Sequence, residues 1–334
     1  MRTDLPGRVV VLAGGLGHER EVSLRSGRRV VEALHDVGVE ASTADLDGSL
    51  LAVLTADPPD VVFPVLHGGS GEDGAVRELL DVLALAYVGA TPAACRVAFD
   101  KPTAKSVVAA GGVATPISAA LPQALFRDLG AASVLDALVD RLGLPLAVKP
   151  ARGGSALGFS AVRKAEDLPA AMVACFSYGE TALVERLIEG TEIAVSVVDT
   201  GDGPVALPAV EIVPVSGRYD YTARYTAGAA EFFVPARLDP AVLDRAADVA
   251  LTAHRRLGLR DLSRTDLIVD AGGTPWFLEV NVAPGMTETS LLPQAATAAG
   301  IGAAKLYGDL VSSALARGGR RPVKEPAPAV DKAT

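Results

Sequence analysis

The chain is 334 residues long, 49% of its positions are hydrophobic, 4% are aromatic, and its formal charge is −9. This length suggests two or three domains, and the hydrophobic share is large enough for packed cores, which excludes wholesale disorder. The acidic balance and the scarcity of aromatic side chains argue against a general nucleic-acid-binding protein. Any anionic ligand must therefore be held locally by a few cations and backbone amides.

The N-terminal part alternates predicted strands and helices. Residues 8–13 form an apolar run that is typical of a buried strand, and a helix with one apolar face is expected over 21–35. A second strand is expected at 60–66 and a second helix from 74 to about 84. This alternation predicts a small parallel α/β domain over residues 1–92.

The middle part, residues 93–186, contains predicted strands at 144–149 and 181–185. The loop at 150–158, directly after the first of these strands, is rich in glycine. An uncharged stretch, 106–126, is long enough to span a bilayer, but a glycine pair and two prolines interrupt it. It is therefore expected to be a helix end, a turn and a short strand, and no membrane insertion is predicted.

The third part, residues 187–317, is rich in predicted strands and contains a predicted helix near 240–257. Residues 318–334 are rich in Gly, Arg, Pro and Lys and are predicted to be a disordered tail. The N-terminus shows no signal-peptide pattern, and two cysteines are too few for a disulfide framework. We therefore expect a cytoplasmic protein in which Cys95 and Cys175 are buried thiols.

The first candidate site is a predicted hairpin over 264–281 that turns at a glycine pair. With a two-residue turn, Asp266 lies opposite Glu279 and Arg264 lies opposite Asn281, so all four side chains share one face. The other face is expected to be apolar and carries Leu267, Val269, Leu278, Val280 and Val282. Two carboxylates and an amide suit Mg²⁺, although a merely solvated polar face is the commoner explanation of such a pattern.

The second candidate site is the glycine-rich loop, in which Lys149 ends a strand and three glycines follow up to Gly158. The N–H groups of such a loop can surround phosphate oxygens, and the lysine adds a positive charge. The loop is not a P-loop, because Phe159 and Ser160 stand where Lys and Ser or Thr are needed. Taken alone it fits an ordinary turn equally well, but beside the hairpin it favours a phosphate site.

Glu19 follows the first predicted strand and His67 follows the second. Ligands bind beyond the carboxyl ends of parallel strands, and a glutamate there could hold an ammonium group. The alternative is that Glu19 only compensates the dipole of the next helix. Glu72 and Asp73 are expected to cap the helix that begins at Gly74.

These motifs, in this order, resemble the D-alanine–D-alanine ligases of the ATP-grasp superfamily, from about residue 9 to about residue 315. The resemblance implies an α/β fold, with α+β character in the C-terminal parts: an ATP-grasp fold preceded by a small parallel α/β (Rossmann-like) N-terminal domain. The matching motifs are Gly14-Gly15, Glu19-Arg20-Glu21-Val22-Ser23-Leu24, Ser26-Gly27, His67-Gly68, Glu72-Asp73-Gly74, Asp100-Lys101, Lys149-Pro150, Glu185, Tyr219-Asp220-Tyr221, Arg264 with Asp266, Glu279 with Asn281, and Pro284-Gly285-Met286-Thr287.

The resemblance also implies that ATP binds between the middle and third parts, with two Mg²⁺ ions, which Mn²⁺ could replace. The implied phosphate contacts are Lys101, Lys149, Gly153, Gly154 and Ser155. Those to adenine and ribose are Glu185, the Ile188 backbone and Glu192. The implied metal ligands are Asp266, Glu279 and Asn281.

For the amino-acid substrates, the resemblance implies two D-alanine sites. Glu19 and His67 would bind the first D-alanine, and Arg224, Ser290 and the Leu291 amide would bind the second. Ser155 and Tyr225 would form a hydrogen-bonded set with Glu19. Arg264 and the Gly285 amide would stabilise the tetrahedral oxyanion.

The implied activity is ATP-dependent formation of D-alanyl-D-alanine through D-alanyl phosphate, for peptidoglycan precursor synthesis, by a homodimer. The chain departs from the family pattern at three places, with Arg224 for Lys, Ala156 for Ser and Val282-Ala283 for Thr-Ser. Two alternatives stay open: a ligase of shifted specificity, such as D-alanine–D-lactate or a specialised dipeptide, and a nucleotide-binding protein without turnover. Tyr225 favours an amine acceptor, and residues 219–232 are expected to form a mobile lid.

Overall fold

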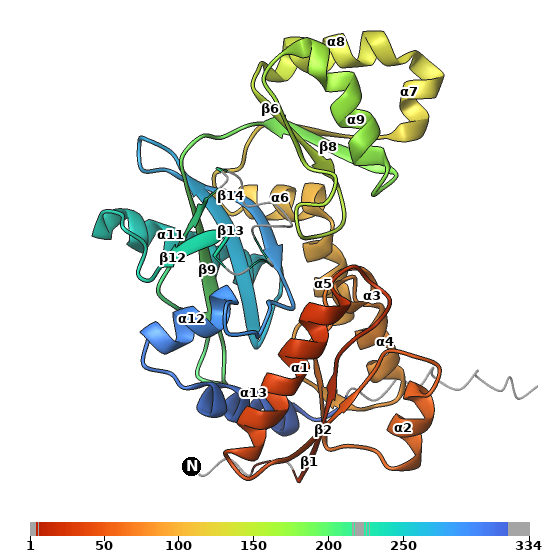
Figure 1. The fold of residues 1–334 in the computed structure, drawn as a ribbon, viewed down its shortest axis with the longest axis vertical. Coiled ribbons are helices and arrows are strands. Elements are labelled where there is room, and N and C mark those ends of the chain that lie inside the picture. The colour runs from red at the N-terminus through yellow and green to blue at the C-terminus, as the bar shows by residue number, and fades with distance from the viewer. Residues whose placement is uncertain are drawn as a thin grey trace, which may run out of the picture.

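The computed structural model of the protein describes residues 5, 7–215, 217, 224, 226 and 228–319. Three sheets organise these residues into three stacked regions, which Figure 1 shows from bottom to top as the N-terminal region, a large central sheet and a helix-covered lobe. The expected architecture, a parallel α/β sheet followed by mainly antiparallel sheets, is confirmed.

The N-terminal sheet is parallel and has the strand order β2-β1-β3-β4. Its central strand, β1, is buried because valines and leucine occupy both of its faces. The strands are β1 (Arg8–Leu12), β2 (Glu40–Ala44), β3 (Val61–Pro64) and β4 (Ala86–Tyr87). The helices of this region are α1 (Arg20–His35), α2 (Leu50–Ala56), α3 (Gly69–Glu72) and α4 (Ala75–Val82).

The upper lobe has an antiparallel sheet in the order β5-β8-β6-β7. Its apolar side chains pack with those of three helices into one buried cluster, including an edge-to-face contact between Phe126 and Phe176. The strands are β5 (Ser118–Pro122), β6 (Leu146–Pro150), β7 (Ser160–Val162) and β8 (Thr181–Arg186). The helices are α7 (Gln123–Leu129), α8 (Ala131–Leu142), η1 (Ala165–Asp167) and α9 (Leu168–Phe176).

The third sheet has the order β12-β11-β9-β13-β14, with β10 paired to β9. Its strands are β9 (Thr191–Val198), β10 (Val205–Ala206), β11 (Val210–Pro214), β12 (Ala230–Phe233), β13 (Leu262–Val269) and β14 (Pro275–Asn281). The helices packed on it are α11 (Pro240–Arg256), α5 (Pro92–Phe99) and α6 (Lys101–Ala109). The expected division assigned α5 and α6 to the middle part, but their alanines and Cys95 pack against Leu267 and Phe277 of the third sheet.

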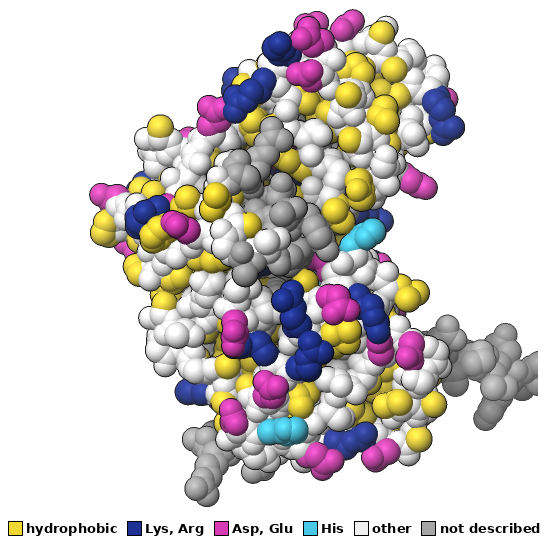
Figure 2. Space-filling model, in the orientation of Figure 1, with side chains coloured by type: hydrophobic (Ala, Val, Ile, Leu, Met, Phe, Trp, Pro, Cys, Tyr) yellow, Lys and Arg dark blue, Asp and Glu magenta, His cyan; other side chains and the backbone are white. Residues whose placement is uncertain are grey.

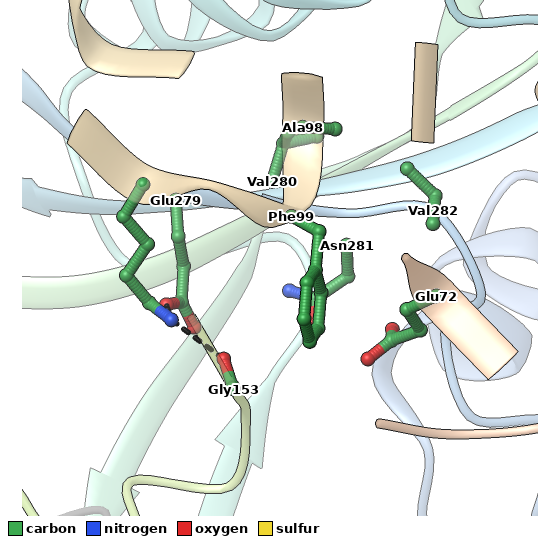
Figure 3. Close-up of a pocket in the computed structure, with 9 residues that line it drawn as sticks. Glu72, Ala98, Phe99, Gly153, Glu279, Val280, Asn281 and Val282 are labelled. Atoms are coloured by element: carbon green, nitrogen blue, oxygen red, sulfur yellow. Dashed lines mark hydrogen bonds and ion pairs between the residues drawn. The ribbon is translucent and has the colours of Figure 1, made fainter. Parts of the chain in front are cut away.

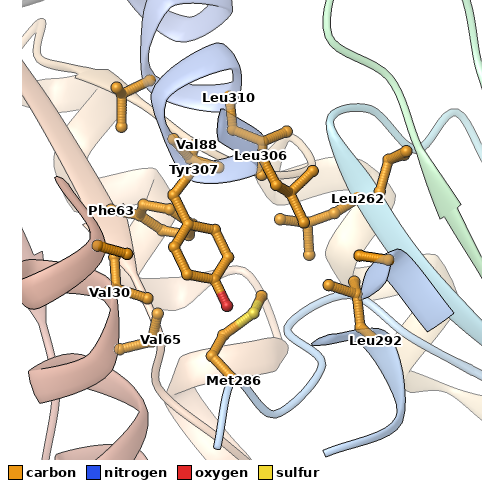
Figure 4. Close-up of a cluster of buried hydrophobic side chains, with 14 of the residues drawn as sticks. Val30, Phe63, Val65, Val88, Leu262, Met286, Leu292, Leu306, Tyr307 and Leu310 are labelled. Atoms are coloured by element: carbon orange, nitrogen blue, oxygen red, sulfur yellow. The ribbon is translucent and has the colours of Figure 1, made fainter. Parts of the chain in front are cut away.

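The last two helices are α12 (Leu291–Ala298) and α13 (Ala303–Arg317). Helix α13 packs against α1 and strands β3 and β4, so it completes the core of the N-terminal region. Tyr307 of this helix is 1% exposed, and its ring meets Phe63 edge to face at 5.9 Å. Figure 4 shows these two rings beside Met286 and Leu292, which come from the C-terminal part of the chain.

Within the described residues, no helix combines the length and the apolar character needed to cross a bilayer. In the uncharged stretch, α6 ends at Ala109 and β5 begins at Ser118, as expected. Cys95 and Cys175 are both buried, and burial raises the pKa of both thiols, that of Cys175 to about 11. Figure 2 shows basic and acidic side chains interspersed over the face that it draws.

Candidate active site

A cavity of about 850 Å³ is lined by the upper-lobe strands β6 and β8 and by the third-sheet strands β9, β11, β13 and β14. A ligand of the size of a nucleotide fits such a volume. Ten of the sequence-predicted site residues line it: Lys101, Lys149, Gly153, Gly154, Glu185, Ile188, Glu192, Arg224, Asp266 and Glu279.

Lys101 lies at the start of α6, where the side chain of Asp100 caps the helix by accepting a hydrogen bond from Thr103 N at 3.1 Å. Its backbone N–H donates to Ala151 O at 3.0 Å, and its Nζ donates to Gly153 O at 2.5 Å. Lys101 therefore ties the first turn of α6 to the glycine-rich loop.

The glycine-rich loop requires backbone conformations that L-residues seldom adopt. Gly153 has a φ of +119°, which suits glycine, but Ser155 and Ala156 have φ values of 54° and 55°. The left-handed conformation costs about 1 kcal/mol for each non-glycine residue, so contacts must hold the loop in place. One such contact is the hydrogen bond that Ser155 Oγ donates to Glu19 Oε1 at 2.5 Å.

Glu185 is 2% exposed and lies between two lysines. Lys149 Nζ lies 2.6 Å from its Oε1, and Lys105 Nζ bonds its Oε2. Burial would raise the pKa of Glu185, but the two lysines outweigh burial and lower it. Lys105 was not predicted from the sequence, although its position one helical turn after Lys101 places both lysines on one face of α6.

Glu192 lies on β9 and lines the same cavity. Burial raises its pKa to about 7, and the nearby positive charge of Arg224 opposes that rise. A carboxyl in this setting can accept or donate a hydrogen bond, which suits contact with sugar hydroxyls.

The predicted hairpin register is confirmed for the four polar residues of the candidate site: Arg264 is paired with Asn281, and Asp266 with Glu279. Beyond Asp266 the register shifts by one residue, because the turn is closed by a hydrogen bond from Asp270 N to Thr274 O at 3.1 Å. This turn contains three residues instead of the expected two, and a bulge at Leu278 absorbs the difference.

The bulge corrects one predicted orientation. Leu278, expected on the apolar face, lines the cavity, whereas Phe277 is fully buried in the core below the sheet. The other expected core residues are buried: Leu267, Val269, Val280 and Val282.

The two carboxylates of the hairpin are paired with cations of the protein. Arg264 donates to both oxygens of Asp266, at 2.7 and 2.8 Å, and Asn281 Nδ2 lies 3.3 Å from Asp266 Oδ2. Lys101 Nζ lies 3.4 Å from Glu279 Oε2. Burial would raise the pKa of Glu279, but Lys101 and the neighbouring cations lower it to about 2.

This donor set fits a hard divalent cation. Asp266, Glu279 and Asn281 supply oxygen ligands from adjacent strands, and the charge on Glu279 is retained at any physiological pH. Among the described residues, no group of three or more His, Cys, Asp and Glu side chains is arranged for a metal, so the amide oxygen and the substrate would have to complete the ligand set. Figure 3 shows Glu279 and Asn281 on β14, near Gly153. Lys101 Nζ contacts both the Glu279 carboxylate and the Gly153 carbonyl.

Beyond the carboxyl ends of the N-terminal strands lie Glu19 and His67. Among the described residues the Glu19 carboxylate does not cap α1; it accepts the bond from Ser155, so the helix-dipole alternative does not account for its contacts. His67 Nδ1 donates to Ala283 O at 2.9 Å, and burial lowers the pKa of the imidazole although Glu19 opposes this. The N-terminal region is thus bonded both to the glycine-rich loop and to the segment after β14.

Glu72 has a different setting from the expected helix cap. The N-cap residue of α4 is Gly74, and the Asp73 side chain before it accepts a bond from Ala75 N at 2.8 Å. Glu72 is 7% exposed and accepts from Gly68 N at 2.9 Å. Burial raises the pKa of Glu72 to about 7, and Glu19 adds to the rise. It lines a small cavity of about 20 Å³ together with Glu279 and Asn281, a placement that only tertiary structure reveals (Figure 3).

Ser290 and Leu291, predicted to bind the second D-alanine, lie at the start of α12, and Gly285, predicted to stabilise the oxyanion, lies next to Ser290. Ser290 Oγ accepts from Thr287 N at 3.0 Å, and a Cβ at position 285 would lie 2.6 Å from that oxygen, so a side chain there would displace the Ser290 hydroxyl. The first amides of a helix attract anions, which suits a substrate carboxylate. Tyr225, the motif at 219–221 and most of the expected tail lie outside the described residues.

The chain is similar to proteins of one family along most of its length. Residues 43–90 match the family described as "D-ala D-ala ligase N-terminus" and residues 112–312 match "D-ala D-ala ligase C-terminus". It is 40% identical over 311 residues to the D-alanine--D-alanine ligase of Bordetella petrii, covering 93% of both chains. To that of Desulforudis audaxviator it is 41% identical, covering 93% of this chain and 99% of the relative.

Solved structures agree with the sequence comparisons. The D-alanine--D-alanine ligase from Bacillus anthracis superposes with a TM-score of 0.79 at 29% identity, covering 93% of this chain and 98% of that one. A structure of that enzyme complexed with ATP superposes with a TM-score of 0.77 at 28% identity and the same coverage. The VanG D-Ala:D-Ser ligase from Enterococcus faecalis gives 0.80 at 26% identity, covering 92% and 99%.

Proposed function

The chain belongs to the D-alanine–D-alanine ligase family, and from that premise we propose how its residues join two D-alanine molecules at the expense of ATP. The enzyme is an ATP-dependent ligase, and its product serves peptidoglycan precursor synthesis. The observation that carries the proposal is the convergence of two lysines, the glycine-rich loop and the facing carboxylates on one nucleotide-sized cavity.

ATP binds in this cavity with its phosphates at Lys101, Lys149 and the loop residues Gly153 to Ser155. The adenine contacts Glu185 and the backbone at Ile188, and Glu192 receives the ribose hydroxyls. Support comes from the lining of the cavity and from the bond between Lys101 and Gly153, which holds lysine and loop together.

Asp266, Glu279 and Asn281 would hold Mg²⁺. The ions, when bound, would neutralise the phosphate charge that develops during transfer. The residues themselves supply two fixed negative charges beside the phosphate lysines, and Arg264 keeps the Asp266 carboxylate in one orientation.

The reaction proceeds in two steps. Glu19 binds the ammonium group of the first D-alanine, and His67 lies near its carboxylate. That carboxylate attacks the γ-phosphorus of ATP and the bond from this phosphorus to the ADP oxygen breaks, which gives D-alanyl phosphate and ADP. The amine of the second D-alanine then attacks the acyl carbon, phosphate leaves with the electrons of its C–O bond, and the amine loses a proton as the amide forms. Arg264 and the Gly285 N–H stabilise the oxyanion of the tetrahedral intermediate.

Glu19 and Ser155 organise the first of these steps. Their hydrogen bond joins the ammonium-binding carboxylate of the N-terminal region to the loop over the phosphates. The reacting carboxylate and the γ-phosphate are thereby brought to one place, and positioning of this kind accounts for much of the rate of phosphoryl transfer. Tyr225 is the third proposed member of this set.

Arg224, Ser290 and the Leu291 amide receive the carboxylate of the second D-alanine. The VanG D-Ala:D-Ser ligase, whose name gives D-serine as the second substrate, superposes as well as the D-alanine--D-alanine ligase of Bacillus anthracis does. A ligase of shifted acceptor specificity is therefore the second candidate function. We further propose a homodimer in the cytoplasm, where ATP is available.

The test is ADP release with D-alanine alone, and with D-alanine plus D-serine, D-lactate or L-alanine, with the products identified by mass spectrometry. We expect ADP and D-alanyl-D-alanine from D-alanine alone. Turnover that depends on D-serine or D-lactate would support the second candidate. ATP binding without any turnover that depends on an amino acid would reject both ligase functions.

A further inference from the structure

Lys105 is a buried cation that has no role in the mechanism proposed above. Its side chain is 4% exposed, and its Nζ bonds Glu185 Oε2. We propose that Lys105 is a specificity-determining residue that keeps Glu185 ionised, so that the base site selects a 6-aminopurine over a 6-oxopurine nucleotide. This inference rests on the proposed contact between Glu185 and the base.

Lys149 and Lys105, the two lysines paired with Glu185, differ in their access to the proposed nucleotide site. Lys149 lies on β6 and lines the cavity, so bound phosphates can attract it away from Glu185. Lys105 lies on α6 behind Glu185 and is not among the described residues that line the cavity. Lys105 is therefore the counter-ion that remains when ATP is bound.

The surroundings of Glu185 make a permanent counter-ion necessary. The charged groups facing it are Lys149 from β6 and Lys105 from α6, while its partner on the third neighbouring element, β5, is the neutral Ser118. A carboxylate that is 2% exposed takes up a proton when its cations are removed, because burial disfavours the charged form. Burial also lowers the pKa of Lys105, and Glu185 opposes this, so each group stabilises the charge of the other.

The protonation state of Glu185 decides which purine it can bind. An ionised carboxylate only accepts hydrogen bonds, so it pairs with the amino group of adenine and repels the carbonyl oxygen of hypoxanthine. A protonated carboxyl can donate to that oxygen. The oxygens of Glu185 have room for this contact, because each carboxylate oxygen accepts more than one bond.

The experiment measures kcat/KM for ATP and for ITP, with saturating D-alanine and Mg²⁺, in the wild type and in Lys105→Met. We expect the ATP-to-ITP ratio to fall about tenfold in the variant, because a hydrogen bond to a charged acceptor is roughly twice as strong as one to a neutral acceptor. Lys305→Met is the matched control, since that lysine is 71% exposed on α13, and its ratio should equal that of the wild type.

A double-mutant cycle separates specificity from a structural role. Glu185→Gln should lower the ratio by itself, and adding Lys105→Met to it should change the ratio no further, since the lysine then has no charge to maintain. An equal loss for ATP and ITP in Lys105→Met overturns the inference. Should that variant fail to fold, unchanged discrimination in Glu185→Gln overturns it instead. If the wild-type protein releases no ADP in response to D-alanine, the proposed function is refuted, and the inference about Lys105 falls with it.

Discussion

Glu279 is the residue on which the positive charges of the site converge. It is half-buried beside Lys101, and the positive charges of Lys101 and Lys149 lower its pKa to about 2. Its strand partner is Asp266, so the two carboxylates are held together by the hydrogen-bonded ladder between β13 and β14. Replacing Glu279 by glutamine removes the negative charge and keeps the size of the side chain.

We predict that Glu279→Gln lowers ligase turnover by at least about a hundredfold, because it deletes a charged oxygen ligand of the proposed Mg²⁺ site. ADP release measured over a range of Mg²⁺ concentrations tests this, with direct Mn²⁺ binding as a second readout. Glu166→Gln, at a residue whose side chain is 74% exposed, is the control and should behave as the wild type. Unchanged turnover and Mn²⁺ affinity in Glu279→Gln would reject the metal assignment.

The positions of individual site residues could be predicted where they follow from a short stretch of sequence. The alternation of side chains along a strand sufficed to bring Arg264, Asp266, Glu279 and Asn281 to one face. It could not reveal Lys105 or the setting of Glu72, because both depend on partners distant in the chain.

Helix α11 is joined to strand β13 by a buried polar pair. His254, 2% exposed, lies on α11, and its Nδ1 is 2.8 Å from the hydroxyl of Ser263. Burial lowers the pKa of this imidazole to about 4, and among the described residues its Nε2 has no hydrogen-bond partner. The packing of helix on strand therefore depends on a neutral histidine.

This pair predicts a pH dependence of stability. The unfolded chain takes up a proton on His254 below pH 6.5 and the folded chain only below about 4, so the contribution is present above 6.5 and lost as the pH falls through this window. Between pH 7 and pH 5 the free energy of unfolding should fall by about 2 kcal/mol more in the wild type than in His254→Gln. Urea unfolding at both pH values measures the difference, and equal losses would contradict the assignment.

The secondary structure of these elements could be predicted from the sequence, but their finer geometry could not. The helix expected near 240–257 is α11, and the strands of the expected hairpin over 264–281 are β13 and β14. The bulge at Leu278 was missed, because the three-residue turn depends on Asp270 accepting bonds from Gly272 N and Thr274 N. Hydrophobic alternation carries no information about such a turn.

At the scale of the whole molecule, a buried aspartate, Asp261, connects segments that lie far apart in the sequence. Asp261, 1% exposed, precedes β13 and accepts two hydrogen bonds from Arg317 at the end of α13, at 2.7 and 2.6 Å. It also accepts from Gly89 N at 2.6 Å, directly after β4. One carboxylate thus connects the N-terminal sheet, the third sheet and the last helix.

We predict that Arg317→Met lowers the free energy of unfolding by about 2–3 kcal/mol, because it leaves the Asp261 carboxylate buried without its main cation. Adding Asp261→Asn should restore part of the loss, since asparagine tolerates the left-handed backbone that Asp261 adopts, with φ 66°. Thermal or urea unfolding measures both effects. Arg141→Met, at an exposed arginine in the last turn of α8, should stay within about 0.5 kcal/mol of the wild type.

The parallel sheet followed by antiparallel sheets could be predicted from the sequence, because the first part alternates strands and helices and the third part is rich in strands. The return of α13 to the N-terminal sheet could not be predicted, since the periodicity of a helix shows which face is apolar but not what covers it. The same holds for α5 and α6, which pack on the sheet that follows them in the chain.

The contact between Phe63 and Tyr307 has a consequence for biosynthesis. The two rings stand near opposite ends of the sequence, yet they belong to one core. While the ribosome is still making the chain, the N-terminal strands pair but keep one apolar surface uncovered until the last helix emerges. Such surfaces invite aggregation and chaperone binding, and high sequence separation slows folding. A nascent chain stalled before residue 303 would therefore depend on a holdase to remain soluble.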